Sequence, residues 1–380
     1  RVASLADRQK WAHESIPRAH ELFSRGRVVA AFQLAEEILE ILPDDSSANT
    51  LWDRVKRPPL LIELRPQGML VEYRNGFEID APWTAVGTTP IPDVDLPEGE
   101  LRFRFSKDGY VTRQIQHRLP KNKWSSGKQD FLHVKTGDWP EKMTFVKGAK
   151  AKEYWRDAVG DFFIDQYEVT NAEFQKFVDA GAYQDESLWE GLEFLDDGNP
   201  VPWKEAMKRF VDASGESGPS TWRAGRYPAE KGSYPVGGVS WYEAVAFANF
   251  SEKQLPTVHH WRRATETDQM HVLATLSNFS SQSPAPVGRN KGIGEFEVYD
   301  LGGNVREWCW NPDDQGWRSF CGGAWDDNAY QFAAPDFKSP WDRNPRNGFR
   351  CVRDQQEPRS ETLAAMQLPT KLPLSQPKLD

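Results

Sequence analysis

The sequence predicts an α+β protein in three parts: an α-helical hairpin over residues 1–58, a small β-sandwich over 59–122 and a larger mixed domain over 138–355. The hydrophobic spacing changes from steps of three and four residues to strict alternation, and a long region rich in Gly, Pro and Trp follows. A chain of 380 residues exceeds what one hydrophobic core usually organises, so several domains are expected. Residues 123–137 are expected to form a polar linker and 356–380 a flexible tail.

The composition indicates a globular chain. Hydrophobic residues make up 38% and aromatic residues 12%, which is enough to form packed cores. The formal net charge is −9, and acidic and basic residues are interspersed, which argues against a phosphate-backbone partner. No stretch approaches the roughly 18 apolar residues of a membrane helix. We therefore expect neither nucleic acid as a partner nor a membrane span within this sequence.

The cysteines and the first residues bear on the cellular context. The chain has three cysteines, Cys309, Cys321 and Cys351, which is too few and an odd number for a disulfide framework. This usage favours a reducing compartment, the cytoplasm. The chain begins with Arg1 rather than Met and shows no signal peptide, so we expect it to be part of a longer protein.

Residues 14–42 are predicted to be helical, with a break at Gly26, because apolar residues recur at three- and four-residue steps. Ala48–Val55 is predicted to be a following helix. The spacing of Gly26, Ala31 and Pro43 resembles the second helix of a tetratricopeptide repeat. One copy does not make a solenoid, which normally needs three, so a generic helical linker remains the alternative.

From Leu60 onward apolar and polar residues alternate, which predicts short antiparallel strands. The phrases at 87–90, 96–100 and 107–110 resemble the turns of the PEGA module, a small β-sandwich. This resemblance implies a spacer or interaction module without chemistry.

The C-terminal region contains several phrases in a distinctive order. Thr170 is predicted to cap a helix over 171–179, and Ser240 one over 242–252. The phrases lie at 161–171, 234–241, 255–264, 299–308, 322–325 and 348–351. Together they resemble the formylglycine-generating enzyme (sulfatase-modifying factor) family over 138–355. This resemblance implies a loop-rich variant of the C-type-lectin fold.

The resemblance also implies that the family's chemistry is missing. The enzymes of this family bind copper(I) through two cysteines five positions apart, just after a Gly-Gly phrase, and use it to activate oxygen. Counted from Gly322-Gly323, these positions are Asp327 and Phe332. We therefore expect no copper, no catalytic residue and no enzyme activity. The three cysteines present are expected to be buried thiols in a β core, with a redox or metal role as the alternative.

Other catalytic motifs are not visible. A related branch of the family holds iron with three histidines, and the seven histidines here offer no such set. His259-His260 is expected to be a surface or structural pair. No Ser/His/Asp triad, phosphate-binding loop or Cys-x-x-Cys pair is apparent.

Calcium is the one metal that the resemblance implies. The family binds hard cations around the phrase before Glu-Trp, which corresponds here to Asp300, Gly303, Val305 and Glu307. A second family site would involve Asn278 and the carbonyl of Phe279. The alternative is that Glu307 forms a buried structural ion pair with a nearby arginine such as Arg350.

The segment between Trp325 and Asn347 is the predicted ligand-binding surface. In the family's fold this segment faces the ligand, and its mixture of aromatic, acidic, amide and Arg side chains is typical of recognition surfaces. We expect a protein or peptide ligand. The alternative is a solvated loop with structural tryptophans. The candidate residues are Trp325, Asp326, Asp327, Asn328, Tyr330, Gln331, Phe332, Trp341, Asp342, Arg343, Asn344 and Arg346.

Three functions remain open at this point. Domains of this family behind helical and PEGA-like modules often belong to bacterial signalling proteins, which predicts a non-catalytic sensory or regulatory module, with an upstream serine/threonine kinase domain as a potential partner. A formylglycine-type oxidoreductase with displaced cysteines is the second reading. A retroelement-diversified binding protein is the third, although such proteins usually end soon after the Gly-Phe-Arg phrase.

Overall fold

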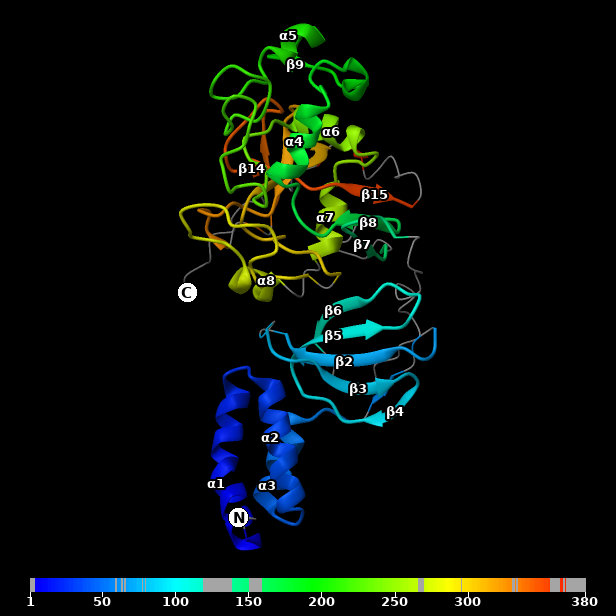
Figure 1. Ribbon diagram of the computed structural model, residues 1–380, viewed down its shortest axis with the longest axis vertical. Helices are drawn as coiled ribbons and strands as arrows, with labels where there is room; N and C mark the ends of the chain where they lie inside the picture. Colours follow the sequence, from blue (N-terminus) through cyan, green and yellow to red (C-terminus); the bar gives the residue numbers. More distant parts are fainter. Residues whose placement is uncertain are drawn as a thin grey trace, which may run out of the picture. The chain divides into compact units, whose positions relative to one another are not determined.

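The structure is a computed structural model. It describes residues 4–58, 60–62, 64, 66–76, 78, 80–118, 139–149, 159–265, 270–294, 296–329, 332, 334–355, 363, 364 and 366. The predicted linker, most of the predicted tail, and two candidate ligand residues, Tyr330 and Gln331, lie outside the described residues. The chain divides into two compact units, 1–141 with 295–297, and 142–294 with 298–380. Both are mixtures of helix and strand, as predicted (Figure 1).

Three helices begin the first unit: α1 (Leu5–Ser24), α2 (Val28–Ile41) and α3 (Ser46–Val55). The predicted break at Gly26 is present, and this glycine adopts the left-handed φ of 76° that favours Gly. Helix α1 begins earlier than the predicted residue 14, because Ser4 forms a capping box with Asp7. The helices pack through small side chains, among them Ala12, Ala19 and Ala31, which are fully buried.

The first unit continues with six strands. They form a four-stranded antiparallel sheet in the order β3-β2-β5-β6 and a separate β1-β4 pair. The predicted alternation holds on β5, where Leu101, Phe103 and Phe105 are buried on one face. The strands are β1 (Leu60–Ile62), β2 (Leu70–Asn75), β3 (Thr84–Thr88), β4 (Ile91–Val94), β5 (Glu100–Ser106) and β6 (Arg113–Arg118).

The helices and strands of the first unit pack together instead of forming two separate modules. The amide of Asn75 donates to the carbonyl of Gly26 at 2.9 Å. A Cβ at Gly99 would lie 2.8 Å from a methyl group of Val28, so only glycine fits there. The sequence predicted a helical hairpin and a β-sandwich as distinct domains, and in the structure both lie within one compact unit.

The second unit contains two larger sheets and five α-helices within its described residues (Figure 1). One sheet has the order β13-β12-β11-β14 and the other β15-β8-β7, and β9 and β10 form a small hairpin. The strands are β7 (Met143–Val146), β8 (Phe162–Asp165), β9 (Leu195–Asp196), β10 (Asn199–Pro200), β11 (Arg306–Pro312), β12 (Arg318–Cys321), β13 (Asp336–Lys338), β14 (Asn347–Gly348) and β15 (Val352–Asp354). The helices are α4 (Asn171–Asp179), α5 (Trp203–Met207), α6 (Trp241–Phe250), α7 (Val258–Thr265) and α8 (Met270–Leu276), with the 3-10 turn η2 (Glu186–Trp189).

Both predicted helix caps of the second unit are confirmed. The Thr170 hydroxyl accepts from the backbone N–H of Glu173, and the Ser240 hydroxyl accepts from that of Glu243. Each glutamate returns the bond to its cap residue, so both helices begin with a capping box. Helix α6 ends at Phe250, two residues before the predicted end at Glu252, where the backbone takes a left-handed φ of 53°.

Aromatic rings fill the core of the second unit. Residues 241–248 of helix α6 are all buried, so this helix runs through the core. Phe174 stacks on Phe247 with ring centroids 5.4 Å apart, and Trp222 and Phe349 meet Phe174 edge-on. Such rings provide the burial that short, irregular elements cannot provide alone.

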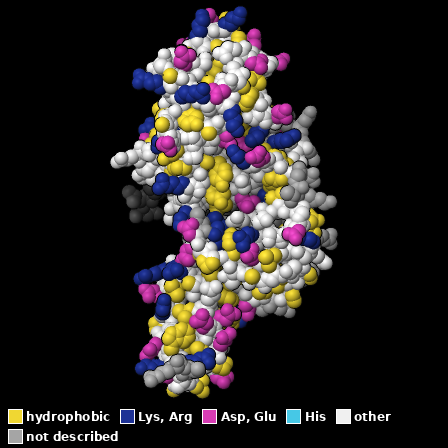
Figure 2. All heavy atoms as spheres, viewed as in Figure 1, with side chains coloured by type: hydrophobic (Ala, Val, Ile, Leu, Met, Phe, Trp, Pro, Cys, Tyr) yellow, Lys and Arg dark blue, Asp and Glu magenta, His cyan; other side chains and the backbone are white. Residues whose placement is uncertain are grey.

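The surface carries charges of both signs. Figure 2 shows Lys and Arg side chains interspersed with Asp and Glu over the visible face. None of the helices in the described part of the chain is long and apolar enough to cross a membrane.

Candidate functional site

The predicted binding segment, residues 325–347, is held at both ends by sheet strands. It leaves β12 through Gly322 and Gly323, whose φ angles of 94° and 73° lie in the left-handed region. It returns as β14, which pairs in parallel with β11. Within the segment, β13 pairs with β12.

The charged side chains of this segment are paired with arginines of the same unit. Asp327 accepts two hydrogen bonds from Arg306, at 2.8 and 2.7 Å, and a third from the backbone N–H of Ala324 at 2.8 Å. Asp326 accepts from Nε of Arg346 at 2.7 Å and also from its Nη2. The Arg346 guanidinium thereby lowers the pKa of Asp326. Nε and Nη2 of Arg346 are thus engaged by Asp326, but its side chain is 40% exposed, so its role in ligand binding stays a prediction.

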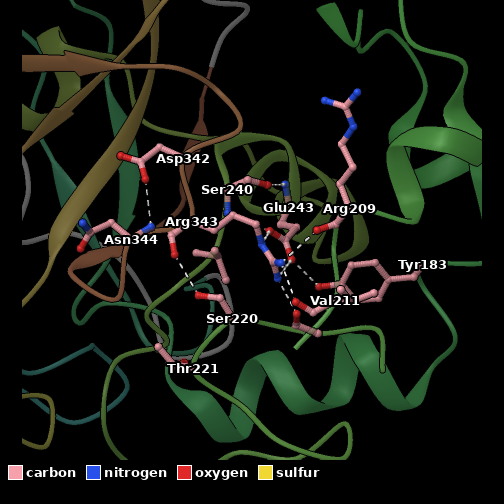
Figure 3. A network of polar contacts seen from close by, with 12 residues as sticks. Tyr183, Arg209, Val211, Ser220, Thr221, Ser240, Glu243, Asp342, Arg343 and Asn344 are labelled. Atoms are coloured by element: carbon pink, nitrogen blue, oxygen red, sulfur yellow. Dashed lines mark hydrogen bonds and ion pairs between the residues drawn. The ribbon is translucent and has the colours of Figure 1, made fainter. Parts of the chain in front are cut away.

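Arg343 is the centre of a buried network (Figure 3). It donates from Nε and Nη2 to the two oxygens of Glu243, at 2.9 and 3.1 Å. Its remaining N–H groups donate to the backbone carbonyls of Val211, Arg209 and Gly218. All five guanidinium donors are therefore used within the protein, so Arg343 has no free donor for a ligand.

Glu243 is the acidic partner in this network. Its carboxylate is completely buried and also accepts from the hydroxyl of Tyr183 at 2.8 Å and from the backbone N–H of Ser240 at 2.8 Å. Burial raises the pKa of Tyr183, and the negative charge of Glu243 raises it further. The tyrosine therefore stays protonated as a donor. The network joins helix α6 to three loops and has a structural role.

Asp342 and Asn344 shape the chain next to this network. Asp342 accepts from the backbone N–H of Asn344 at 3.1 Å, and Asn344 accepts from that of Arg346 at 3.0 Å. These short-range bonds are typical of Asx turns. They set the path of the backbone that carries Arg343 into the protein.

Trp341 also makes contacts within the protein. Its indole N–H donates to the carbonyl of Leu195 at 2.6 Å, and its ring stacks on Phe210 with centroids 5.5 Å apart. Phe332 is 4% exposed and packs against Phe279. Burial of Phe332 contradicts a ligand-facing side chain there, whereas Trp341 is half-buried and its role in ligand binding stays a prediction. Of the candidate residues that the structure describes, Asp326 and Asn328 are exposed and Phe332 is buried. The others are half-buried: Trp325, Asp327, Trp341, Asp342, Arg343, Asn344 and Arg346.

Glu307, a candidate calcium ligand, forms the buried ion pair with Arg350 that was the alternative to calcium binding. Its two carboxylate oxygens accept from Nε and Nη2 of Arg350 at 2.6 and 2.7 Å, and both side chains are fully buried. Arg350 also donates to the carbonyls of Asp165 and Tyr299. Burial raises the pKa of Glu307, although the charge of Arg350 opposes this shift.

Asp300 and Glu168 bring two further buried carboxyl groups close to this pair. Asp300 accepts from the backbone N–H of Gly288 at 2.6 Å, and Glu168 accepts from the amide of Asn304 at 3.1 Å. Burial raises the pKa of Glu168 well above its usual range, and the charges of Asp300 and Glu307 raise it further. The charge of Arg350 therefore acts on three buried acids, Glu307, Asp300 and Glu168. Glu168 was not among the residues predicted from the sequence.

The remaining calcium candidates make backbone contacts. A Cβ at Gly303 would lie 2.2 Å from the carbonyl oxygen of Asn278, which explains the glycine. The backbone N–H of Val305 donates to Glu168 at 3.4 Å, and the Asn278 amide donates to Asn304 and Ser283. Among the described residues, no group of three or more His, Cys, Asp or Glu side chains is placed to hold a metal ion.

The three cysteines are buried free thiols, as predicted. Cys309 and Cys321 lie on the neighbouring strands β11 and β12, with Sγ atoms 3.9 Å apart. Burial raises the pKa of Cys309, and the adjacent Cys321 raises it further. Burial likewise raises the pKa of Cys351. Cys309 and Cys351 are therefore protonated and poorly reactive.

His260 is structural, in agreement with one of the two predicted roles. It is buried, and its Nδ1 accepts from the backbone N–H of Thr257 at 3.1 Å at the start of α7. Its Nε2 lies 3.0 Å from the carboxylate of Asp354 on β15. The imidazole thus links the start of the helix to the last strand of the unit.

A cavity of about 670 Å³ lies in a stretch that sequence reasoning passed over, residues 186–203. Its lining includes three acids, Glu186, Glu190 and Glu193, and three aromatic residues, Trp189, Phe194 and Trp203. The three glutamates are exposed. Trp189 and Phe194 are buried, so Trp203 is the half-buried ring among these three.

Comparison with known proteins identifies the family. The model of the sulfatase-modifying factor enzyme 1-like domain matches residues 128–355, more than half of the chain. The chain belongs to this family. A sulfatase-modifying factor enzyme 1-like domain therefore accounts for most of the second unit.

Relatives of this domain include an enzyme and a kinase. The formylglycine-generating enzyme of Bos taurus is 28% identical over 187 residues, which cover 45% of this chain and 49% of the enzyme. The serine/threonine-protein kinase pkn1 of Chlamydia caviae is 26% identical over 189 residues, which cover 44% of this chain and 27% of the kinase. The chain thus spans about a quarter to a half of the length of these relatives. Among solved structures, CarF is 20% identical with a TM-score of 0.41, covering 57% of this chain and 99% of CarF.

Proposed function

We propose that the sulfatase-modifying factor enzyme 1-like domain of this chain is a non-catalytic module that binds a protein or peptide ligand. It would act as a sensory or regulatory part of a larger bacterial signalling protein, such as a serine/threonine kinase. The main support for this proposal is the pair of side chains at the two positions where the enzymes have copper-binding cysteines. Asp327 there is paired with Arg306, and Phe332 is a buried ring.

The side chains at these two positions are poor ligands for copper(I). Copper(I) prefers soft thiolate ligands, and a carboxylate engaged by an arginine is a hard and already paired donor. The nearest substitute is the Cys309–Cys321 pair, which is buried and whose Cys309 has a raised pKa. A formylglycine-type oxidoreductase with displaced cysteines would have to use these thiols, and it remains the alternative function.

The relatives and the first unit support a signalling context. The match to a serine/threonine-protein kinase covers 44% of this chain, and the match to the enzyme covers a similar share, 45%. The first unit would then serve as a spacer or interaction module, as its tetratricopeptide-like and PEGA-like resemblances imply. For the ligand itself, Asp326 and Asn328 are the exposed candidates among the described residues.

Copper binding tests the loss of catalysis. The unchanged protein is expected to bind no copper(I) in a chelator competition, and to consume no oxygen with a cysteine-containing peptide. The double variant Asp327→Cys with Phe332→Cys is expected to bind about one equivalent, because it restores two thiols at the family's spacing. The two single variants serve as controls. Stoichiometric copper(I) binding by the unchanged protein, lost in Cys309→Ser, would instead favour the oxidoreductase with displaced cysteines.

We also propose that calcium stabilises the second unit, because three buried carboxyl groups face the single charge of Arg350. Calcium is bound by oxygen ligands such as carboxylates. Because Glu307 already forms an ion pair with Arg350, Asp300 would be the main acidic ligand. Millimolar calcium is expected to raise the Tm of the second unit by at least about 2 °C relative to a chelator, because it binds the native state alone. Asp300→Asn should remove this rise, and magnesium is the control. An identical Tm in chelator and calcium would mean that protons, not calcium, offset the buried charge.

A further inference from the structure

The cavity at residues 186–203 is a feature that the proposed function does not use. All of its lining comes from one continuous stretch of chain that includes η2, the start of β9, the end of β10 and the start of α5. Its volume of about 670 Å³ falls within the range of roughly 300–1,000 Å³ that is typical of small-molecule sites. Asp327 and Phe332 do not line it, so its role is independent of whether catalysis has been lost.

The charge of the cavity is one-sided. Glu186, Glu190 and Glu193 line it, and no lysine or arginine does. In the part of the chain that the structure describes, the carboxylates of these three glutamates form no ion pair or side-chain hydrogen bond. Three exposed acids on a short stretch repel one another, so a bound cation would relieve this repulsion.

The rest of the lining is apolar and aromatic. Trp203 contributes a half-buried ring, whereas Trp189 and Phe194 are buried against other rings of the core, and Leu192, Leu195 and Val201 contribute aliphatic groups. The indole N–H of Trp203 is buried and has no hydrogen-bond partner within the described residues. Aromatic faces attract ammonium groups, and aliphatic walls accommodate methylene chains. A bare metal ion would leave these apolar walls without a role.

We propose that this cavity binds a small aliphatic cation with two or more ammonium groups, of the polyamine class. A ligand with one positive charge would leave most of the charge of the three glutamates unbalanced, whereas a polyamine spreads several charges along a methylene chain. The ammonium groups pair with the carboxylates, and the methylene segments lie against the aromatic and aliphatic walls.

The test is isothermal titration of the full chain with spermidine at low salt. Saturable binding at one site is expected, stronger than that of the diamine putrescine and weakened by added salt. Glu190→Gln and Glu193→Gln should each weaken binding by about two- to fivefold, the range for a single exposed ion pair. The triple variant with Glu186→Gln should weaken it by about tenfold or more. Glu216→Gln removes an exposed carboxylate elsewhere and should leave binding unchanged.

Several outcomes would overturn the proposal. One is an absence of saturable binding by the unchanged protein. Another is equal binding by the triple variant, with an unaltered Tm showing that the variant is folded. Displacement of spermidine by equimolar magnesium would reduce the site to a general cation surface. Tighter binding of an arginine- or lysine-rich peptide than of spermidine would assign the cavity to a protein partner instead. Each of these outcomes leaves the copper test of lost catalysis unaffected.

Discussion

Replacing Arg343 by methionine is expected to destabilise the second unit by about 3–5 kcal/mol, because it leaves the carboxylate of Glu243 buried without its cation. Glu243 is completely buried and Arg343 is 13% exposed, so water cannot compensate for the lost charge. The carbonyls of Val211 and Arg209 would lose their donors as well. Urea denaturation followed by tryptophan fluorescence measures the change in the free energy of unfolding.

Two further variants separate charge from packing. Arg223→Met removes an exposed arginine of the same unit and should change the free energy of unfolding by less than about 0.5 kcal/mol. Combining Arg343→Met with Glu243→Gln should destabilise by less than the sum of the single changes, because the second change removes the unpaired charge left by the first. If Arg343→Met unfolds at the same urea concentration as the unchanged protein, the network does not hold these loops in place.

Features that depend on near neighbours in the chain could be predicted from the sequence. Thr170 and Ser240 were recognised as helix caps because each cap bonds to a residue three positions later. The alternation of Leu101, Phe103 and Phe105 likewise indicated a strand with one buried face. Local patterns of this kind indicated the helices of the first unit and helices α4 and α6 of the second, but not α5, α7 or α8.

The roles of the polar side chains could not be predicted, because their partners are distant in the sequence. Arg343 and Glu243 are 100 positions apart, and Glu168 and Asn304 are 136 positions apart. A segment with aromatic, arginine and acidic residues has the composition of a recognition surface. Its composition is equally that of a segment whose arginines and tryptophans hold the fold, and only the three-dimensional partners distinguish these two cases.

The cavity at 186–203 was missed for a related reason. Glu186, Glu190 and Glu193 follow the three- and four-residue spacing of a solvated helix face, which is the commonest explanation of such a pattern. In the structure only residues 186–189 form a short 3-10 turn, and the chain then bends so that all three acids line one hollow with Phe194 and Trp203. The bend depends on contacts such as the bond from Tyr242 to the carbonyl of Glu193.

Replacing Arg350 by methionine is expected to destabilise the second unit by about 3–5 kcal/mol at pH 8, because it leaves Glu307 without its cation among three buried acids. Both members of the pair are fully buried. Burial raises the pKa of Glu168, Glu307 and Asp300, and the charge of Arg350 opposes each of these shifts. Without Arg350 these pKa values rise further, so the native variant binds more protons than the unchanged protein.

The destabilisation caused by Arg350→Met should therefore increase as the pH rises. A carboxyl group whose pKa is higher in the native state than in the unfolded state stabilises the native state at low pH, and this contribution is lost as the pH rises through its native pKa. The difference between Arg350→Met and the unchanged protein should thus grow from pH 5 to pH 8 and shrink toward the ordinary glutamate pKa of 4.5. Arg353→Met, which removes an exposed arginine three residues away, should show neither the loss nor the pH dependence. A loss that is equal at all pH values would assign the effect to the bonds that Arg350 donates to the carbonyls of Asp165 and Tyr299, not to the buried charge.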